Sequence, residues 1–151
     1  MTRTLTTLPL MERVMFLRRV PLFVDLPPPD LKPIAMIAEE DAFPDGETIA
    51  EQGEPGDAMH IIVSGEVSIV LSGGQRAEQS LAVRMPGEVI GEMALISSKP
   101  RMASLVARGP VRVLTIGQRA FEALLRERPE ISIAVMRVLC QRLADRDAEG
   151  L

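Results

Sequence analysis

Two charged side chains nine positions apart, Glu92 and Arg101, are the strongest candidates for chemistry in this sequence. Gly91 precedes the carboxylate, and residues 92–96 are predicted to form a short helix whose first N–H groups and positive dipole end favour an anion. Arg101 follows a polar turn at residues 97–100, from where its planar guanidinium can bind the same anion. The Glu92 carboxylate would repel an anion but can accept a hydrogen bond from a sugar hydroxyl. Together these residues predict a pocket for a phosphate joined to a ribose.

The stretch that holds these residues resembles the phosphate-binding cassette of cyclic nucleotide-binding domains. The resemblance rests on Gly91-Glu-Met-Ala-Leu-Ile followed by Pro100-Arg-Met-Ala-Ser. The first half alone would be weak evidence, but the two halves together have the spacing of that family. The family includes the bacterial catabolite activator protein, the regulatory subunit of protein kinase A and cyclic-nucleotide-gated channels. A plain strand–turn–helix connection with a surface arginine is the alternative interpretation.

The resemblance implies a role for each part of the cassette. Arg101 is expected to bind the phosphate, helped by the backbone N–H groups of Ala94 and Ala103, and Glu92 to accept a hydrogen bond from the ribose 2′-hydroxyl. That hydroxyl is the one free ribose group of a 3′,5′-cyclic nucleotide. The ligand-binding residues expected from the cassette are Gly91, Glu92, Met93, Ala94, Arg101, Met102 and Ala103.

The resemblance also bears on the base. Relatives that favour cyclic GMP commonly carry Thr directly after the cassette arginine, where this chain has Met102, so cyclic AMP is the expected ligand and cyclic GMP the alternative. Ile69 and Ala82 are expected to contact the base. Arg142, in the last predicted helix, is expected to stack on the base in place of an aromatic side chain, or else to form a surface salt bridge.

Composition excludes several other kinds of site. One cysteine and one histidine leave too few ligands for zinc or an iron–sulfur cluster, and no cofactor is expected. No Ser/His/Asp or Cys/His set is apparent, so the chain is not expected to be an enzyme. A formal net charge of −4 argues against direct nucleic-acid binding. No apolar run approaches the roughly 20 residues of a membrane span, so no membrane insertion by this chain is expected.

Hydrophobic periodicity and turn residues predict helices at both ends of a single domain of 151 residues. Residues 1–40 should contain helices at Pro9–Arg19 and at Leu31 to about Glu39, with Asp30 as the cap of the second. Residues 118–151 should contain helices at Gln118 to about Arg128 and at Glu130 to about Asp147. The resemblance implies that the last helices form a lid over the pocket.

Residues 41–117 contain short strand-like runs separated by glycine turns, which is typical of a closed or sandwiched antiparallel barrel. With the cassette at residues 87–104, the resemblance implies an α+β fold, an antiparallel jelly-roll barrel flanked by helices. The turn glycines are interpreted as turn or bulge positions and not as ligand contacts. The predicted strands are Thr48–Ala50, Met59–Val63, Val67–Leu71, Gln79–Met85, Ala103–Ala107 and Val111–Ile116.

The sequence therefore predicts a cyclic nucleotide-binding regulatory module that senses cyclic AMP and moves its flanking helices to control an effector outside this chain. The single cysteine suits the reducing cytoplasm, or the cytoplasmic side of a membrane if the chain is attached to a larger membrane protein. The alternative is an interaction domain with an unused pocket that forms a homodimer through the last helix.

Overall fold

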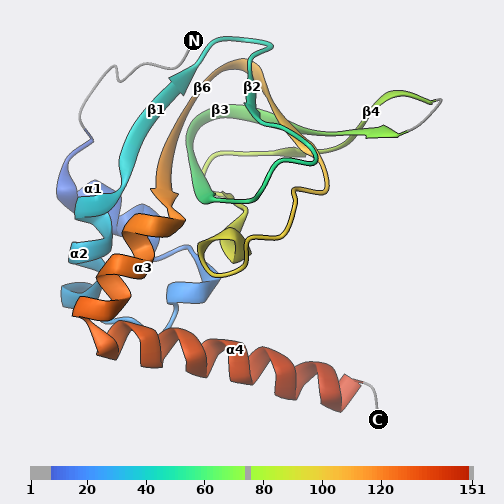
Figure 1. The fold of residues 1–151 in the computed structure, drawn as a ribbon. Helices are drawn as coiled ribbons and strands as arrows, with labels where there is room; N and C mark the ends of the chain where they lie inside the picture. The colour runs from blue at the N-terminus through green and yellow to red at the C-terminus, as the bar shows by residue number, and fades with distance from the viewer. Residues whose placement is uncertain (1–7, 74–75, 150–151) are drawn as a thin grey trace.

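The computed structural model describes residues 8–73 and 76–149, in which helices pack at one end of an antiparallel sheet (Figure 1). The long last helix runs beneath the sheet, and the short yellow helix η2 lies between them. The helices are α1 (Leu10–Leu17), the 3-10 helix η1 (Pro21–Phe23), α2 (Pro28–Ile37), the 3-10 helix η2 (Glu92–Leu95), α3 (Gln118–Glu127) and α4 (Pro129–Glu149).

Six strands of the described residues form one sheet in the order β1-β6-β3-β4, with β2 also paired to β6 and β5 to β3. Every pairing is antiparallel. The predicted α+β fold, an antiparallel sheet between N-terminal and C-terminal helices, is therefore confirmed. The strands are β1 (Glu39–Phe43), β2 (Thr48–Ala50), β3 (Ala58–Gly73), β4 (Arg76–Arg84), β5 (Val89–Ile90) and β6 (Ser104–Gly117).

Two strands are longer than the glycine pattern predicts. β3 joins the two predicted strands Met59–Val63 and Val67–Leu71 into one. β6 likewise joins the predicted strands Ala103–Ala107 and Val111–Ile116, and it begins at Ser104. The residues expected to end them act as bulges: Gly65 has φ +84° and lies where the pairing of β3 with β6 shifts register. Such bulges bend a strand without ending it. The long strands therefore curve while keeping their hydrogen bonds.

The start of the sheet was not predicted correctly. We expected a helix to about Glu39, but α2 ends at Ile37 and Glu39 already begins β1, which pairs with β6. The Asp30 cap is also wrong, because α2 begins at Pro28 and has no side-chain cap hydrogen bond. Proline is well suited to a first helical position, so the prolines at 28 and 29 extend the helix in the N-terminal direction. One of the expected turn glycines, the second in Ser72-Gly-Gly, lies outside the described residues.

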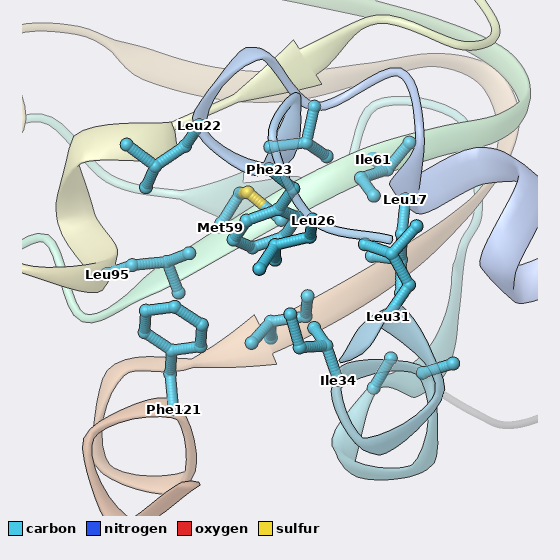
Figure 2. Packing of buried hydrophobic residues seen from close by; sticks show 14 of the residues in the cluster. Leu17, Leu22, Phe23, Leu26, Leu31, Ile34, Met59, Ile61, Leu95 and Phe121 are labelled. Carbon is cyan, nitrogen blue, oxygen red and sulfur yellow. The ribbon is translucent and has the colours of Figure 1, made fainter. Parts of the chain in front are cut away.

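The main hydrophobic core joins the helices to the sheet and to η2. The rings of Phe23 in η1 and Phe121 in α3 lie with centroids 5.7 Å apart. Leu95 of η2 is fully buried and lies near Phe121 in the same cluster, as Figure 2 shows. Burying a large apolar side chain contributes about 1.5–3 kcal/mol. The segment that carries the cassette is thus anchored to the N-terminal and C-terminal helices by packing.

Candidate ligand-binding site

The cassette begins with a single turn of 3-10 helix. Gly91 precedes it with φ +74°, a left-handed conformation that glycine adopts without steric cost. The turn ends at Leu95, one residue before the predicted end, and its Ala94 N–H donates to the Gly91 carbonyl oxygen at 2.9 Å. A helix of one turn has only a small dipole, and this N–H already has a partner. Attraction for an anion must therefore come mainly from Arg101.

Arg101 lies half-buried beside this turn. Its Nη2 donates to the Ala58 carbonyl oxygen at 2.8 Å, where β3 begins. Burial lowers the pKa of its guanidinium below its usual value, and the charges of Asp57 and Glu54 oppose that shift. An arginine stays cationic at neutral pH under these conditions. The site therefore holds one fixed, partly desolvated positive charge.

The position of Arg101 is set by a neighbouring loop at residues 53–57. Gly53 N–H donates to the Arg101 carbonyl oxygen at 2.9 Å, and Arg101 N–H donates to the Glu54 carbonyl oxygen at 2.8 Å. Gly56 is packed so closely that a Cβ there would lie 3.1 Å from the Lys99 carbonyl oxygen and 3.3 Å from Ala94 Cβ. Two segments far apart in the sequence thus form one rigid support for the guanidinium.

A cavity of about 370 Å³ opens beside Arg101. This volume lies in the range of small-molecule sites. Its apolar wall comes from β3, β5 and β6, and its one arginine faces the cassette turn. The lining residues are Gly56, Ile69, Ile90, Gly91, Met93, Ala94, Ser97, Lys99, Pro100, Arg101, Met102, Ala103 and Leu105. A larger hollow of about 510 Å³ over β2, β3 and β6 has Glu51 as its charged residue, which does not suit an anion.

Seven of the expected site residues line this cavity: Ile69, Gly91, Met93, Ala94, Arg101, Met102 and Ala103. Ala82 does not line it, although it pairs directly with Ile69 in the β3–β4 register. Sequence reasoning missed Gly56, which was interpreted as a turn residue only, and Lys99. Their approach to the cassette follows from the bridge between Pro55 and Pro100, a pairing that no local pattern announces.

Glu92 and Arg142 also lie outside the cavity lining, and they contact each other. Arg142 Nη2 donates to Glu92 Oε1 at 2.8 Å. Glu92 Oε2 accepts from the Leu22 backbone N–H at 2.7 Å. The Arg142 Nη1 atom lies 3.7 Å from Met93 Sδ. In this structure the carboxylate is directed toward the helices, and Arg142 has a salt bridge, which was the alternative expected for it.

Residues 40–128 match the cyclic nucleotide-binding domain family, and this span includes the whole cavity. The chain belongs to that family. Cyclic nucleotide-binding domains are regulatory and non-catalytic, which confirms the expectation that this domain is not an enzyme. In the parts of the chain that the structure describes, no group of three or more His, Cys, Asp or Glu side chains could hold a metal ion.

Three relatives show in which kinds of protein a similar chain is found. A CRP-like cAMP-activated global transcriptional regulator of Mycobacterium tuberculosis is 32% identical over 84% of this chain and 57% of its own length. A cAMP-dependent protein kinase regulatory subunit of Colletotrichum orbiculare is 37% identical over 73% of this chain and 27% of its own length. The N-terminal domain of a Streptomyces coelicolor transcriptional regulator superimposes with a TM-score of 0.82 at 31% identity, over 88% of this chain and 95% of that one.

The chain thus spans little more than half of the mycobacterial regulator and about a quarter of the kinase subunit. The cyclic nucleotide-binding domain is the part that these proteins share with it. None of the described helices is both long enough and apolar enough to cross a membrane.

One buried histidine lies close to the site of this cyclic nucleotide-binding domain. His60 in β3 is buried, and its Nδ1 lies 2.9 Å from Thr115 Oγ1. Burial, and to a smaller extent the charge of Arg101, lowers the pKa of His60 from 6.5 to about 4. The imidazole is therefore neutral at pH 7 and adds no second positive charge beside Arg101.

Proposed function

We propose that this domain binds a cyclic nucleotide, with cyclic AMP as its preferred ligand and cyclic GMP as the alternative. The observation that carries the proposal is that Arg101, beside the left-handed Gly91, is the one arginine among the described residues that line an apolar-walled cavity of about 370 Å³. The descriptions of the two curated relatives, a cAMP-activated regulator and a cAMP-dependent kinase subunit, support the choice of ligand.

In this proposal Arg101 binds the cyclic phosphate, while Gly91 and Ala103 let the ligand approach the backbone closely. A charge-assisted hydrogen bond to a partly buried phosphate contributes on the order of 1.5–3 kcal/mol. Glu92 accepts from the ribose 2′-hydroxyl, which requires its carboxylate to turn toward the cavity. In these roles Arg101 recognises the negative charge of the ligand and Glu92 recognises its sugar.

The base is proposed to lie against the apolar wall at Ile69, with Ala82 beside it. Met102 follows the arginine and is 87% exposed. Its thioether side chain has no hydroxyl to offer to a guanine amino group. Stacking of Arg142 on the base would require it to leave Glu92, to which it is hydrogen-bonded. We therefore assign Arg142 a different role, developed in the next subsection.

Signal transmission is proposed to involve the helices that touch the cassette, with an effector outside the chain. The proposed parts are the N-terminal helices up to Ile37, the strands from Glu39 to Gly117 with the cassette at 87–104, and lid helices from Gln118 onward. A transcriptional regulator is among the relatives, so the predicted absence of direct nucleic-acid binding applies to this domain and not to a larger protein. A cytoplasmic location remains a prediction.

A second candidate function is homodimerisation through α4. Several large apolar side chains on this helix are exposed, including Ile133 at 44%, Met136 at 53% and Leu143 at 60%. Such a stripe favours contact with another apolar surface. In the ligand-independent form of this alternative, the domain would dimerise equally with and without nucleotide. Sedimentation of the domain in both conditions separates it from the leading proposal.

Calorimetric titration of purified, nucleotide-free domain with cyclic AMP and cyclic GMP tests the proposal. We expect micromolar or tighter binding of cyclic AMP, and a loss of about 10- to 100-fold or more for Arg101→Ala. Arg126→Ala, a change on the exposed surface of α3, is the control and should bind as the wild type does. A folded wild-type protein that binds neither ligand would refute the sensor function.

A further inference from the structure

The Glu92 carboxylate joins three elements that are far apart in the sequence. It belongs to η2, accepts the Leu22 N–H of η1 at 2.7 Å and accepts Arg142 Nη2 of α4 at 2.8 Å. The Glu92 side chain is 16% exposed and the Arg142 side chain 37%. One side chain of the cassette therefore makes polar contacts with both of the helical segments that pack beside it.

The hydrogen bonds from Leu22 and Arg142 occupy both oxygens of the Glu92 carboxylate, one of which a ribose hydroxyl would need as its acceptor. Both carboxylate oxygens accept hydrogen bonds on the side of the helices, and Glu92 is not among the residues that line the cavity. Its neighbours Gly91 and Met93 do line the cavity. For Glu92 to bind a ribose its carboxylate must turn toward the cavity, and at least one of the existing donors must then move away or share its acceptor.

The two donors differ in how costly they are to release. Leu22 is fully buried, so its N–H would lose its partner away from water, which is strongly unfavourable. The Arg142 side chain is partly exposed and can be hydrated when it leaves, and such exposed ion pairs contribute little to stability. Arg142 is therefore the donor that gives way.

We propose that Arg142 holds the Glu92 carboxylate away from the cavity, and that the 2′-hydroxyl of a bound ribose replaces Arg142 on Oε1. This inference rests on the proposed function, because it concerns the same site. It makes Arg142 a positioning residue that opposes binding, and it couples ligand binding to α4: the ligand releases the polar contact that ties α4 to η2. The Leu22 N–H remains on Oε2 throughout.

The test compares cyclic AMP with 2′-deoxy cyclic AMP, which lacks only the hydroxyl in question. Arg142→Met removes the guanidinium and keeps an unbranched apolar stem. We expect this variant to bind cyclic AMP roughly two- to five-fold more tightly, the size expected of a partly exposed ion pair, and to bind the 2′-deoxy ligand as the wild type does. Arg146→Met, an exposed change one turn further along α4, is the matched control and should alter neither affinity.

A second pair of variants tests whether the effect passes through Glu92. In the Glu92→Ala background, the further change Arg142→Met should leave the affinity for cyclic AMP unchanged. Weaker binding by Arg142→Met, an equal change for both ligands, or no change for either would each overturn the inference while leaving the sensor function intact. If the wild type bound neither ligand, the proposed function and this inference would fail together.

Discussion

The Arg101 guanidinium lies against the backbone of Gly91. A Cβ atom at Gly91 would come within 3.0 Å of Arg101 Nη1 and 3.1 Å of the Ala58 carbonyl oxygen, the same oxygen that Arg101 Nη2 contacts. The glycine also has φ +74°, which other residues rarely adopt. The absence of a side chain at position 91 thus sets where the guanidinium sits.

Gly91→Ala should therefore weaken both cyclic nucleotide binding and the fold. The methyl group must displace the guanidinium, so we expect at least a 10-fold loss of affinity by calorimetry, with a loss of about 1–2 kcal/mol in the free energy of unfolding. Gly117→Ala is the control, since a Cβ there meets nothing within 4 Å and no positive φ is involved. Unchanged affinity in Gly91→Ala would contradict the close packing.

Gly65→Ala should destabilise the fold strongly, because a Cβ at this bulge would lie 2.2 Å from the Pro110 carbonyl oxygen. Backbone cannot give way as a side-chain tip can, so we expect a loss of about 2–4 kcal/mol in urea unfolding. Gly46→Ala is a matched control: it has a similar φ of +81° with no atom within 4 Å, and should cost only about 1 kcal/mol. Equal losses would show that the backbone angle alone matters.

His60 should make the fold less stable as the pH falls from about 6.5 to 4. The pKa of His60 is about 4 in the folded protein, against the usual 6.5 for a histidine in an unfolded chain, so in this window the unfolded chain binds a proton that the folded one does not. The loss should approach roughly 3 kcal/mol at the acid end. Urea unfolding at several pH values tests this, with His60→Gln as a variant that should lack this part of the pH dependence. Parallel profiles for the two proteins would exclude the effect.

Glu40→Gln should destabilise the attachment of the N-terminal segment to the sheet. Glu40 is 5% exposed; it pairs with Arg112 on one oxygen and accepts the Leu8 N–H on the other at 2.5 Å. Removing the charge of this buried carboxylate leaves Arg112, whose side chain is 31% exposed, without its partner and should cost about 1–3 kcal/mol. Glu66→Gln removes an exposed pair with Arg108 and should cost under about 1 kcal/mol. Thermal unfolding of both variants compares the buried and exposed pairs.

Met102→Thr should shift the ligand preference toward cyclic GMP. Family members that favour cyclic GMP commonly carry Thr at this position. Its hydroxyl can bind the guanine amino group, whereas the Met102 side chain has no hydroxyl. We expect the ratio of cyclic GMP to cyclic AMP affinity to rise by roughly three- to ten-fold, in line with one added hydrogen bond. Met102→Val, of similar shape to Thr but without the hydroxyl, is the control. A ratio that changes equally in both variants would argue against this contact.

The cassette and the fold class could be predicted from the sequence because both depend on local order along the chain. Gly91, Glu92 and Arg101 lie within one short segment, and their types and spacing already describe an anion site. The helices α3 and α4 carry periodic apolar residues and agree with prediction to within about two residues at each end. For these elements the local pattern was sufficient, whereas the start of α2 was mispredicted because Pro28, and not the residue after Asp30, begins the helix.

The remaining features depend on pairings between distant segments. β1 became a strand because it lies beside β6. Gly65 became a bulge, one of the two roles expected for the turn glycines, because β6 continues past it. Gly56 reaches the cavity because it lies close to the cassette: a Cβ added at Gly56 would be 3.3 Å from Ala94 Cβ. The direction of the Glu92 carboxylate depends on Leu22 and Arg142, which lie 70 and 50 positions away. The sequence alone thus determined the types and spacing of the groups proposed to bind a cyclic nucleotide, whereas packing of the helices against η2 sets where those groups point, because a side chain takes its direction from whichever donors the folded chain brings to it.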